Sequence, residues 1–441
     1  MEFSDLLVNL RSVDIANSYL LGKTRQLRQG APWAIIGSNA LELWNRDGDM
    51  SEVFVQTDEQ RLILETVRKF VAEAVTPVAA ELDRQLDPDD CFSWEIVDQT
   101  DRVGIRTMTL SEDWGGMGAD SLTTAMVIEE IAKGDMGVAV VMAQTLKLAQ
   151  IFQKAMTVGQ REKYLPRFRD DPRCLLAIGI TEPETGSNYF IPNSASFQTR
   201  AERSDGGWLI NGMKHFISNG NRAGLYLVFA QTEKGESLFD GSTCFLLERA
   251  APGFSIGRVH DKMGERLANN AELIFEDCFV PDENVVGEVG RGFQVLVDFF
   301  PQSNAYAAAT VLGVSVAAYE LAVEWAKTRN QGGSLLIDHD GIRAQLAEMR
   351  MLNDAARSYI HRAAWSADHQ DQGWDRTLGA LPKVFATQAA WKIVTWASEI
   401  HGGSGYMRDI GLEKLMRDTA AFLHSDGVNR TLLLKAASVM F

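Results

Sequence analysis

The spacing of apolar residues changes twice along this chain, and that change is the strongest constraint on its fold. From Thr57 to about residue 167, apolar side chains recur at helical spacing. Thr57 and Gln60 are typical of a capping box that opens the first of these helices. Between residues 174 and 285 the pattern is that of strands, and from Gly292 onward it is helical again. The sequence therefore predicts an α+β chain in which a β unit lies between two helical units.

The β unit is predicted from short apolar runs that turn formers separate, as at Asp205-Gly-Gly207 and Asn219-Gly220. The five runs are Cys174–Ile180, Trp208–Ile210, Gly224–Ala230, Cys244–Leu247 and Ala271–Phe275. The helical regions contain breaks at Trp114–Gly118, Gly332-Gly333, Gly402-Gly403 and Gly427. We predict an N-terminal extension at 1–55, a helical domain at 56–172, a β domain at 173–288 and a helical bundle at 289–441.

Composition excludes several classes of function. The net charge of the 441 residues is -16, which argues against binding to nucleic acid and against docking on an anionic membrane. The four cysteines are widely spaced and the seven histidines form no ligand array in the sequence, so no metal site and no disulfide framework is predicted. The N-terminus lacks the layout of a signal peptide, and we expect a cytoplasmic protein.

One uncharged stretch, Phe299 to Tyr319, is long enough to consider as a membrane span. Pro301, Gln302 and Asn304 lie near one end of it, and alanines dominate the remainder. This composition favours a buried core helix of a globular protein, and no membrane association is expected.

Four motifs are candidates for chemistry, and each also has an ordinary structural interpretation. Thr181–Ser187 follows an apolar run, and Pro183 and Gly186 favour a tight loop whose N–H groups and hydroxyls can face a ligand. Taken alone, its spacing favours a β-turn rich in small polar residues over a ligand loop. Asn211–Gly220 reads as a hairpin with a second turn, in which Phe216 can stack on a flat ring or pack in the core.

The other two motifs lie near the C-terminus. Ser398–Gly405 ends in glycines that permit close backbone approach to a ligand, although a helix C-cap explains them as well. The glycines do not form a dinucleotide-binding fingerprint. Asp426-Gly427 falls in a break between helices, where a carboxylate can act as a general base. Taken alone, the position favours a capping residue or a solvated charge.

The order and separation of the motifs is more specific than any one of them. The chain carries Thr181-Glu-Pro-Glu-Thr-Gly-Ser187, Asn211-Gly-Met-Lys-His-Phe-Ile-Ser-Asn-Gly220, Lys262-Met-Gly264, Phe275-Glu-Asp-Cys-Phe-Val-Pro281, Gly290-Arg-Gly-Phe293, Thr328-Arg329, Leu346-Ala-Glu-Met349, His401-Gly-Gly403 and Lys414-Leu-Met-Arg-Asp418. From residue 57 to residue 441 this set closely resembles the acyl-CoA dehydrogenase family.

The resemblance implies a fold of an N-terminal helical domain, a middle β-barrel-like domain and a C-terminal four-helix bundle. It also implies a homotetramer that binds FAD across a subunit interface. Positions matched to the family's cofactor contacts are Ile178, Ile180, Thr181, Gly186, Ser187, Phe216, Ser218, Arg329, Glu399, Gly402 and Gly403. Asp426 falls where most members place the catalytic Glu. The implied chemistry is removal of an α proton by this carboxylate, with hydride transfer from the β carbon to flavin N5.

The chain departs from the family pattern at several positions. Asp426 is one methylene shorter than the usual Glu, as in some ring-forming thioester dehydrogenases and in nitroalkane oxidase. Pro301 and Asn304 replace an Asp and an Arg that help hold the CoA thioester, and Ser303 matches a Ser of nitroalkane oxidase. Gly332 occupies the position, three residues after Arg329, where a flavin-contacting Phe is usual.

Two further positions bear on the choice between enzymes. Val428 replaces a Thr whose hydroxyl contacts the cofactor. Leu433 stands where nitroalkane oxidase has an arginine, which argues against that enzyme.

The resulting hypothesis is α,β-dehydrogenation of an acyl thioester, carried on CoA or on a carrier protein, with an atypical ring-bearing or polar acyl group. Ser303 and Asn304 are the candidate substrate residues. An electron-transfer flavoprotein is a candidate partner. Two alternatives stay open: a flavin oxidase of a small carbon acid such as a nitroalkane, and a catalytically silent FAD-binding protein.

Overall fold

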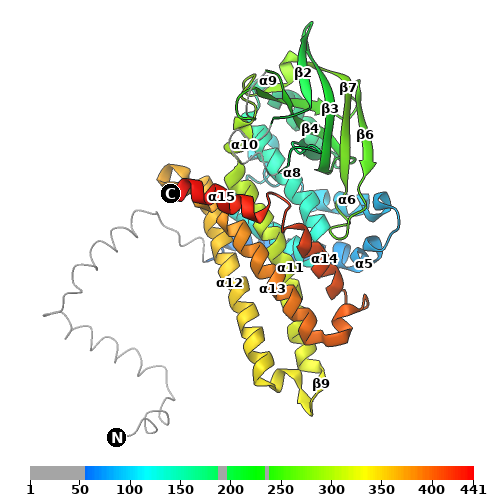
Figure 1. The fold of residues 1–441 in the computed structure, drawn as a ribbon, viewed down its shortest axis with the longest axis vertical. Helices are drawn as coiled ribbons and strands as arrows, with labels where there is room; N and C mark the ends of the chain where they lie inside the picture. Colours follow the sequence, from blue (N-terminus) through cyan, green and yellow to red (C-terminus); the bar gives the residue numbers. More distant parts are fainter. Residues whose placement is uncertain (1–54, 187–195, 234–237) are drawn as a thin grey trace, which may run out of the picture. The chain divides into compact units, whose positions relative to one another are not determined.

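The computed structural model describes residues 55–186, 196–233 and 238–441 (Figure 1). Residues 1–54 of the predicted extension lie outside the described residues. The described chain runs through helices, a mixed sheet and helices again, which confirms the predicted α+β class.

The N-terminal domain is a set of helices that ends where the sheet begins. The predicted capping box is present, with Thr57 Oγ1 accepting the Gln60 N–H at 3.1 Å and Gln60 Oε1 accepting the Thr57 N–H at 3.0 Å. The α-helices are α4 (Asp58–Phe70), α5 (Thr76–Asp83), α6 (Trp94–Arg102), α7 (Ser121–Gly134), α8 (Met136–Ala155) and α9 (Val158–Asp170). Helix α8 is buried along most of its length and packs against α7 and the sheet.

The middle of the chain forms a mixed sheet of eight strands in the order β6-β7-β3-β2-β4-β5-β8, with β1 pairing parallel to β4. The strands are β1 (Leu175–Gly179), β2 (Arg200–Ser204), β3 (Gly207–Ser218), β4 (Ala223–Gln231), β5 (Ser242–Glu248), β6 (Phe254–Val259), β7 (Asn270–Pro281) and β8 (Val285–Val286). Each of the five apolar runs overlaps one of these strands.

The predicted hairpin at Asn211–Gly220 is wrong. Strand β3 continues unbroken to Ser218, and the chain turns only at Asn219 and Gly220. Two register shifts against β7, between Ile210 and Gly212 and between Lys214 and Ile217, bend the strand. Such bulges re-aim individual side chains without ending a strand.

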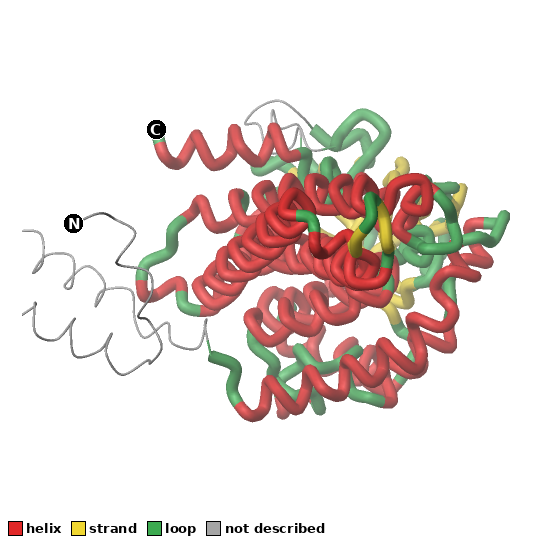
Figure 2. Tube along the Cα trace, turned by 90° about the horizontal axis from the view of Figure 1, so that it is seen from below, coloured by secondary structure: helices red, strands yellow, loops and turns green. Residues whose placement is uncertain are grey.

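The C-terminal domain consists of long helices that lie side by side, as Figure 2 shows from below. The elements are α10 (Gln294–Val297), α11 (Phe300–Thr328), the hairpin β9–β10 (Asn330–Gln331 and Ser334–Leu335), α12 (Asp340–Asp368), α13 (Leu381–His401), α14 (Leu412–Ala421) and α15 (Asn429–Met440). Helix α11 packs against α13, α12, α7 and α8, so it joins the two helical domains.

Helix α11 contains the uncharged stretch noted in the sequence. Among the described helices it is the one whose length and composition would allow it to cross a membrane. In this fold, 72% of its most apolar window is buried inside the protein. This burial is what the sequence predicted for a core helix.

A buried ion cluster joins the three parts of the chain. Lys414 Nζ on α14 lies 2.6 Å from Asp135 Oδ2 and 2.6 Å from Asp418 Oδ2. Asp135 also caps α8 by accepting the Val138 N–H at 3.0 Å. Asp418 Oδ1 accepts the backbone N–H of Glu265, in the loop between β6 and β7, at 2.6 Å. One lysine therefore holds carboxylates that contact all three domains.

The loop between β6 and β7 approaches α14 so closely that only glycine fits at position 264. A Cβ added to Gly264 would lie 2.4 Å from the carbonyl carbon and oxygen of Arg417 and 2.6 Å from the backbone nitrogen of Asp418. Backbone atoms cannot give way as a flexible side chain can. Gly264 of the Lys-Met-Gly motif thus permits the contact between the sheet and the last helices.

We predict that Lys414→Met destabilises the protein by about 3–5 kcal/mol, because it leaves two buried carboxylates without their cation. Urea unfolding measures the change. Lys392→Met is the matched control: the exposed Lys392–Glu348 pair contributes about 0–1 kcal/mol. If both substitutions lowered the free energy of unfolding by the same small amount, the ion cluster around Lys414 would not be important for stability.

Candidate active site

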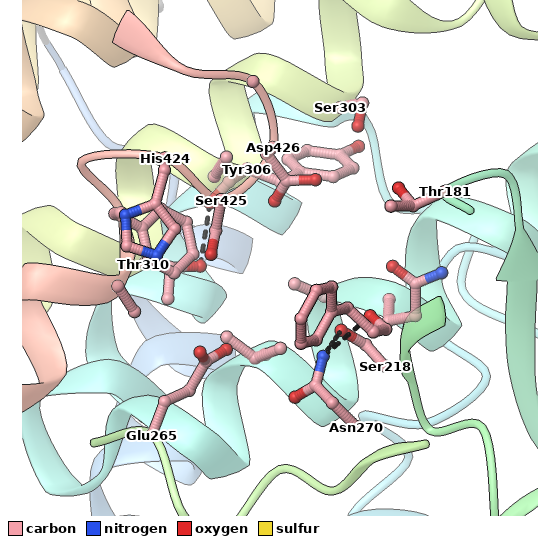
Figure 3. A pocket seen from close by; sticks show the side chains of 18 of the residues that line it. Thr181, Ser218, Glu265, Asn270, Ser303, Tyr306, Thr310, His424, Ser425 and Asp426 are labelled. Atoms are coloured by element: carbon pink, nitrogen blue, oxygen red, sulfur yellow. Dashed lines mark hydrogen bonds between the residues drawn. The ribbon is translucent and has the colours of Figure 1, made fainter. Parts of the chain in front are cut away.

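A cavity of about 520 Å³ lies between α8, α11, the end of β3 and the loop that follows α14. Figure 3 shows its lining, with Asp426 and Ser303 on one side and Ser218 and Asn270 on the other. Apolar strand residues, hydroxyl groups and a few charged side chains line it together. This mixture is typical of a ligand site rather than of a packing defect.

Nine of the residues predicted from the sequence line this one cavity. They are Ile178, Ile180, Thr181, Gly186, Phe216, Ser218, Ser303, Asn304 and Asp426. They come from β1 and the loop after it, from β3, from α11 and from the loop before α15. Asn304 has a structural task as well, because its Nδ2 donates to the carbonyl oxygens of Phe300 at 3.1 Å and Gly379 at 2.8 Å.

The remaining predicted residues lie elsewhere. Arg329, Glu399, Gly402 and Gly403 do not line the cavity; they are exposed at the C-terminal ends of α11 and α13, which meet where Trp325 stacks on His401. Arg329 follows Ser303 by 26 residues of mostly helical chain, which corresponds to roughly 39 Å. Ser187 lies outside the described residues.

A buried ion pair fixes the loop that carries Thr181. Lys214 Nζ donates to Glu182 Oε1 at 2.7 Å and to the Ile180 carbonyl oxygen at 3.2 Å, and both side chains are almost fully buried. Burial lowers the pKa of Lys214 to about 8. The Glu182 carboxylate also accepts the backbone N–H groups of Gln198 and Thr199. The first two motifs of the sequence are therefore bonded to each other.

Strained backbone is concentrated at the cavity. Five described residues other than glycine have positive φ, and three of them, Phe216 at 57°, Glu265 at 55° and Asp426 at 49°, line the cavity. Residues in this region cost conformational free energy and tend to cluster at functional sites. Phe216 is also 57% exposed, so its ring is accessible from the cavity that it lines.

Asp426 lies in a short loop that Lys383 holds in place. The Lys383 ammonium, fully buried on α13, donates to the carbonyl oxygens of Phe422 at 2.7 Å and Gly427 at 2.8 Å and to Asn429 Oδ1 at 3.1 Å. These three acceptors lie on both sides of Asp426. The loop is thus anchored at its two ends, while its carboxylate faces the cavity (Figure 3).

Two histidines and a glutamate meet on the sheet near Phe216, although the sequence predicted no metal site. The ligand atoms of His215, His260 and Glu272 all lie within 4.8 Å of one another. His215 Nε2 is 3.5 Å from Glu272 Oε1, and the rings of both histidines contact the Phe216 ring. The sequence could not show this cluster, because its members come from three different segments. Its contacts support the Phe216 ring.

Comparison with known proteins identifies the family in which these three domains occur together. Models of the N-terminal, middle and C-terminal domains of acyl-CoA dehydrogenases match residues 57–170, 177–278 and 290–441. Cyclohex-1-ene-1-carbonyl-CoA dehydrogenase of Syntrophus aciditrophicus is 32% identical over 406 residues, which cover 92% of this chain and 94% of that protein. This chain belongs to the acyl-CoA dehydrogenase family.

Solved structures of the family superpose on nearly their full length. Butyryl-CoA dehydrogenase from Megasphaera elsdenii has a TM-score of 0.81 and 32% identity, and the match covers 88% of this chain and 99% of that chain. A chain from structural work on the electron transferring flavoprotein of Acidaminococcus fermentans gives the same TM-score and coverage, with 30% identity. The protein is thus an FAD-dependent oxidoreductase that acts on CH–CH groups.

The cavity of this family member fits the ring end of FAD. Ile178 and Ile180 offer apolar surface, Thr181 and Ser218 offer hydroxyl groups, and the half-exposed Phe216 ring offers a flat apolar face. A Cβ added to Gly186 would meet no atom of the described residues within 4 Å, so this part of the loop leaves space where a cofactor can approach.

The sequence did not predict two lysines that contact the Asp426 loop, Lys147 and Lys383. Lys147 lines the cavity from α8, and its Nζ lies 3.4 Å from Asp426 Oδ1. The available signal was that Lys147 is the only charged residue between Met136 and Gln153. Lys383 gave a similar signal, as a cation among the apolar residues that begin α13.

We predict that Lys383→Met slows flavin reduction by a thioester on the order of 10²-fold, because the loop that carries Asp426 would lose its fixed position beside the cavity. Stopped-flow absorbance of the FAD-loaded protein measures the rate. Lys392→Met, on the same helix but exposed, is the control. An unchanged rate in a folded Lys383→Met protein would exclude a positioning role.

Lys383 also predicts a pH dependence of stability. Burial lowers its pKa from 10.5 to about 8, so the unfolded chain keeps the proton to higher pH than the folded chain does. The folded state then binds fewer protons between about pH 8 and 10.5, and the contribution of this group to stability rises with pH in that window. Urea unfolding from pH 7.5 to 9.5 should show native protein gaining stability relative to Lys383→Met. A constant difference would contradict a lowered pKa.

Proposed function

We propose that the protein catalyses FAD-dependent α,β-dehydrogenation of an acyl thioester, with Asp426 as the base. The observation that carries this proposal is the Asp426 carboxylate, which lines a cavity also lined by Thr181, Phe216 and Ser218. A carboxylate in this position can reach an acidic C–H bond of a substrate placed between it and the strand residues. Curated relatives at 32–34% identity are acyl-CoA dehydrogenases, which supports the same reaction class.

In this mechanism the residues of the chain position the reacting atoms. The substrate enters between Asp426 and the end of β3, and Asp426 removes the proton from the carbon next to the thioester carbonyl. FAD, when bound, supplies the acceptor for the hydride that leaves the β carbon. Lys383 keeps the base in place, and the Lys214–Glu182 pair keeps Thr181 in place.

The cofactor is proposed to contact two sets of residues. Ile178, Ile180, Thr181, Gly186, Phe216 and Ser218, together with Ser187, would hold the ring and pyrophosphate of the FAD bound in the same chain. Arg329 is roughly 39 Å from Ser303 along α11, and Glu399, Gly402 and Gly403 lie at the adjoining C-terminal end of α13, where His401 stacks on Trp325. All four are exposed, so a single chain cannot bring both sets to one flavin ring. We therefore propose that the second set serves a neighbouring subunit, in a homotetramer.

The proposed electron acceptor and substrate carrier rest on the relatives of this chain. The electron acceptor is proposed to be an electron-transfer flavoprotein, in line with the structural neighbour from Acidaminococcus fermentans. The substrate is proposed to be carried on CoA or a carrier protein, and the polar lining of the cavity favours an atypical acyl group. The cytoplasm remains the proposed location.

A second candidate, oxidation of a small carbon acid such as a nitroalkane, is favoured by one observation. Asn304 is uncharged, and its Nδ2 is bound to backbone carbonyls, where many acyl-CoA enzymes use an arginine on the thioester. Anaerobic addition of nitroethane separates the candidates: bleaching of the flavin by nitroethane but by no acyl-CoA would establish the oxidase and exclude the dehydrogenase.

We predict that Asp426→Asn retains yellow FAD but is reduced by thioesters on the order of 10²–10⁴-fold more slowly, because the amide cannot accept the α proton. Anaerobic stopped-flow absorbance after addition of butyryl-CoA gives the rate. Asp409→Asn, an exposed acid in the loop before α14, is the control for loss of a carboxylate. Near-normal reduction of Asp426→Asn would remove Asp426 from the role of base.

A further inference from the structure

Lys147 is an unexpected charge for a cavity that holds an acyl chain. It lies on α8, is the only charged residue between Met136 and Gln153, and its side chain is 11% exposed. Val140, Ala143 and Ile151 lie on the same face of α8 and line the same cavity. An apolar acyl group on this face would cover the ammonium without giving it a partner, which is unfavourable.

Lys147 differs from the other cations of the cavity in how it is bound. Lys262 Nζ donates to Asn270 Oδ1 at 2.7 Å and lies 3.6 Å from Glu265, and Arg417 is held by Asp83 and Glu413. Within the described part of the chain, Lys147 donates to Asp426 Oδ1 at 3.4 Å. That distance exceeds the roughly 2.7–2.9 Å of a strong charge-assisted hydrogen bond. Lys147 therefore has donor capacity left for a ligand.

The proposed reaction neutralises Asp426, the carboxylate that faces the Lys147 ammonium. Before proton transfer, Lys147 and Asp426 form a neutral pair. When Asp426 accepts the α proton it becomes neutral, while the ammonium stays positive in a cavity that substrate and cofactor have closed to water. An unpaired buried charge is strongly unfavourable. A second anion, supplied by the substrate, would keep Lys147 paired throughout the step.

We infer that Lys147 binds a carboxylate carried by the acyl group, so that the substrates are thioesters of short dicarboxylic acids; this inference rests on the dehydrogenase function proposed above. Gln144, one turn earlier on the same face of α8, also lines the cavity, and its amide supplies N–H donors for the second carboxylate oxygen. Lys147 and Gln144 together form a two-point site for a carboxylate.

The distance between Lys147 and the base limits the length of the acyl group. The carboxylate would lie about 2.8 Å from Lys147 Nζ, which is itself 3.4 Å from Asp426 Oδ1. The carboxylate is thus at most roughly 6 Å from the base that contacts the α carbon. Acyl groups of four or five carbons, such as succinyl and glutaryl, meet this limit.

The chemical balance is that of a simple dehydrogenation. The α carbon loses a proton to Asp426, the β carbon loses a hydrogen with its electron pair to the flavin, and a carbon–carbon double bond forms. The carboxylate of the acyl group is unchanged and remains on Lys147. No co-reactant is needed beyond the cofactor of the proposed function.

The test compares acyl groups that differ only in the carboxylate, using FAD-loaded protein under anaerobic conditions. Flavin bleaching is followed with glutaryl-CoA and pentanoyl-CoA, and with succinyl-CoA and butyryl-CoA. We expect apparent second-order rates at least about tenfold higher for the dicarboxylic member of a pair, since about 1.4 kcal/mol of selective binding gives that ratio. Lys147→Met should reverse the preference, and Lys147→Arg should retain it.

Lys154→Met is the matched control, because Lys154 is an exposed residue of the same helix that does not line the cavity; it should behave as native protein. Faster bleaching of native protein by pentanoyl-CoA or butyryl-CoA than by its dicarboxylic counterpart would overturn the inference and leave the dehydrogenase function intact. An unchanged preference in Lys147→Met would also overturn it. Bleaching by none of the four thioesters would likewise overturn the inference; the proposed function would fail with it only if ring-bearing and carrier-protein thioesters also left the flavin oxidised.

Discussion

The ion cluster around Lys414 is the interaction on which the geometry of the molecule depends. Asp135 begins α8, Asp418 belongs to α14, and Glu265 lies in the loop from the sheet, so one buried cation sets the relative positions of the three walls of the cavity. Hydrophobic burial favours compactness but does not select one arrangement of domains. A charged centre with two acceptors and a defined geometry does select one, because a misplaced partner would be left buried and unpaired.

The same principle operates at a smaller scale on both sides of the cavity. Lys214 ties the loop after β1 to β3, and Lys383 ties the loop after α14 to α13. Each lysine is buried, each binds backbone carbonyl oxygens, and each has a pKa lowered to about 8 by burial. The two loops that face the cavity are thus held by buried lysines on the side away from it. The side chains that point into the cavity stay available to a ligand.

The sequence predicted the fold class and the five most apolar strands because those runs carry a continuous burial signal. It missed the two-residue strand β8, and it missed β2 and β6, in which most residues are exposed or only partly buried, among them Arg200, Glu202 and Arg258. It predicted a hairpin at Asn211–Gly220, because the glycine signalled a turn where the structure has a bulge in one strand.

Site residues could be predicted where they belong to a short stretch of sequence. Contacts between residues far apart in the chain could not. Nine predicted residues lie around one cavity, each in or beside a short segment that the sequence singled out. Lys147 and Asp426 are 279 residues apart, and no local pattern indicates that they meet. The same applies to His215, His260 and Glu272, which the sheet brings together from three segments.

The left-handed backbone at Asp426 affects which acid suits this position. With φ at 49°, the position favours aspartate over glutamate, because short polar side chains tolerate that region most readily. Glutamate can adopt the same backbone, as Glu265 does at φ 55°, but at a cost in conformational free energy. Glutamate in place of Asp426 would thus lengthen the acid by one methylene and also add strain to the turn that Lys383 holds.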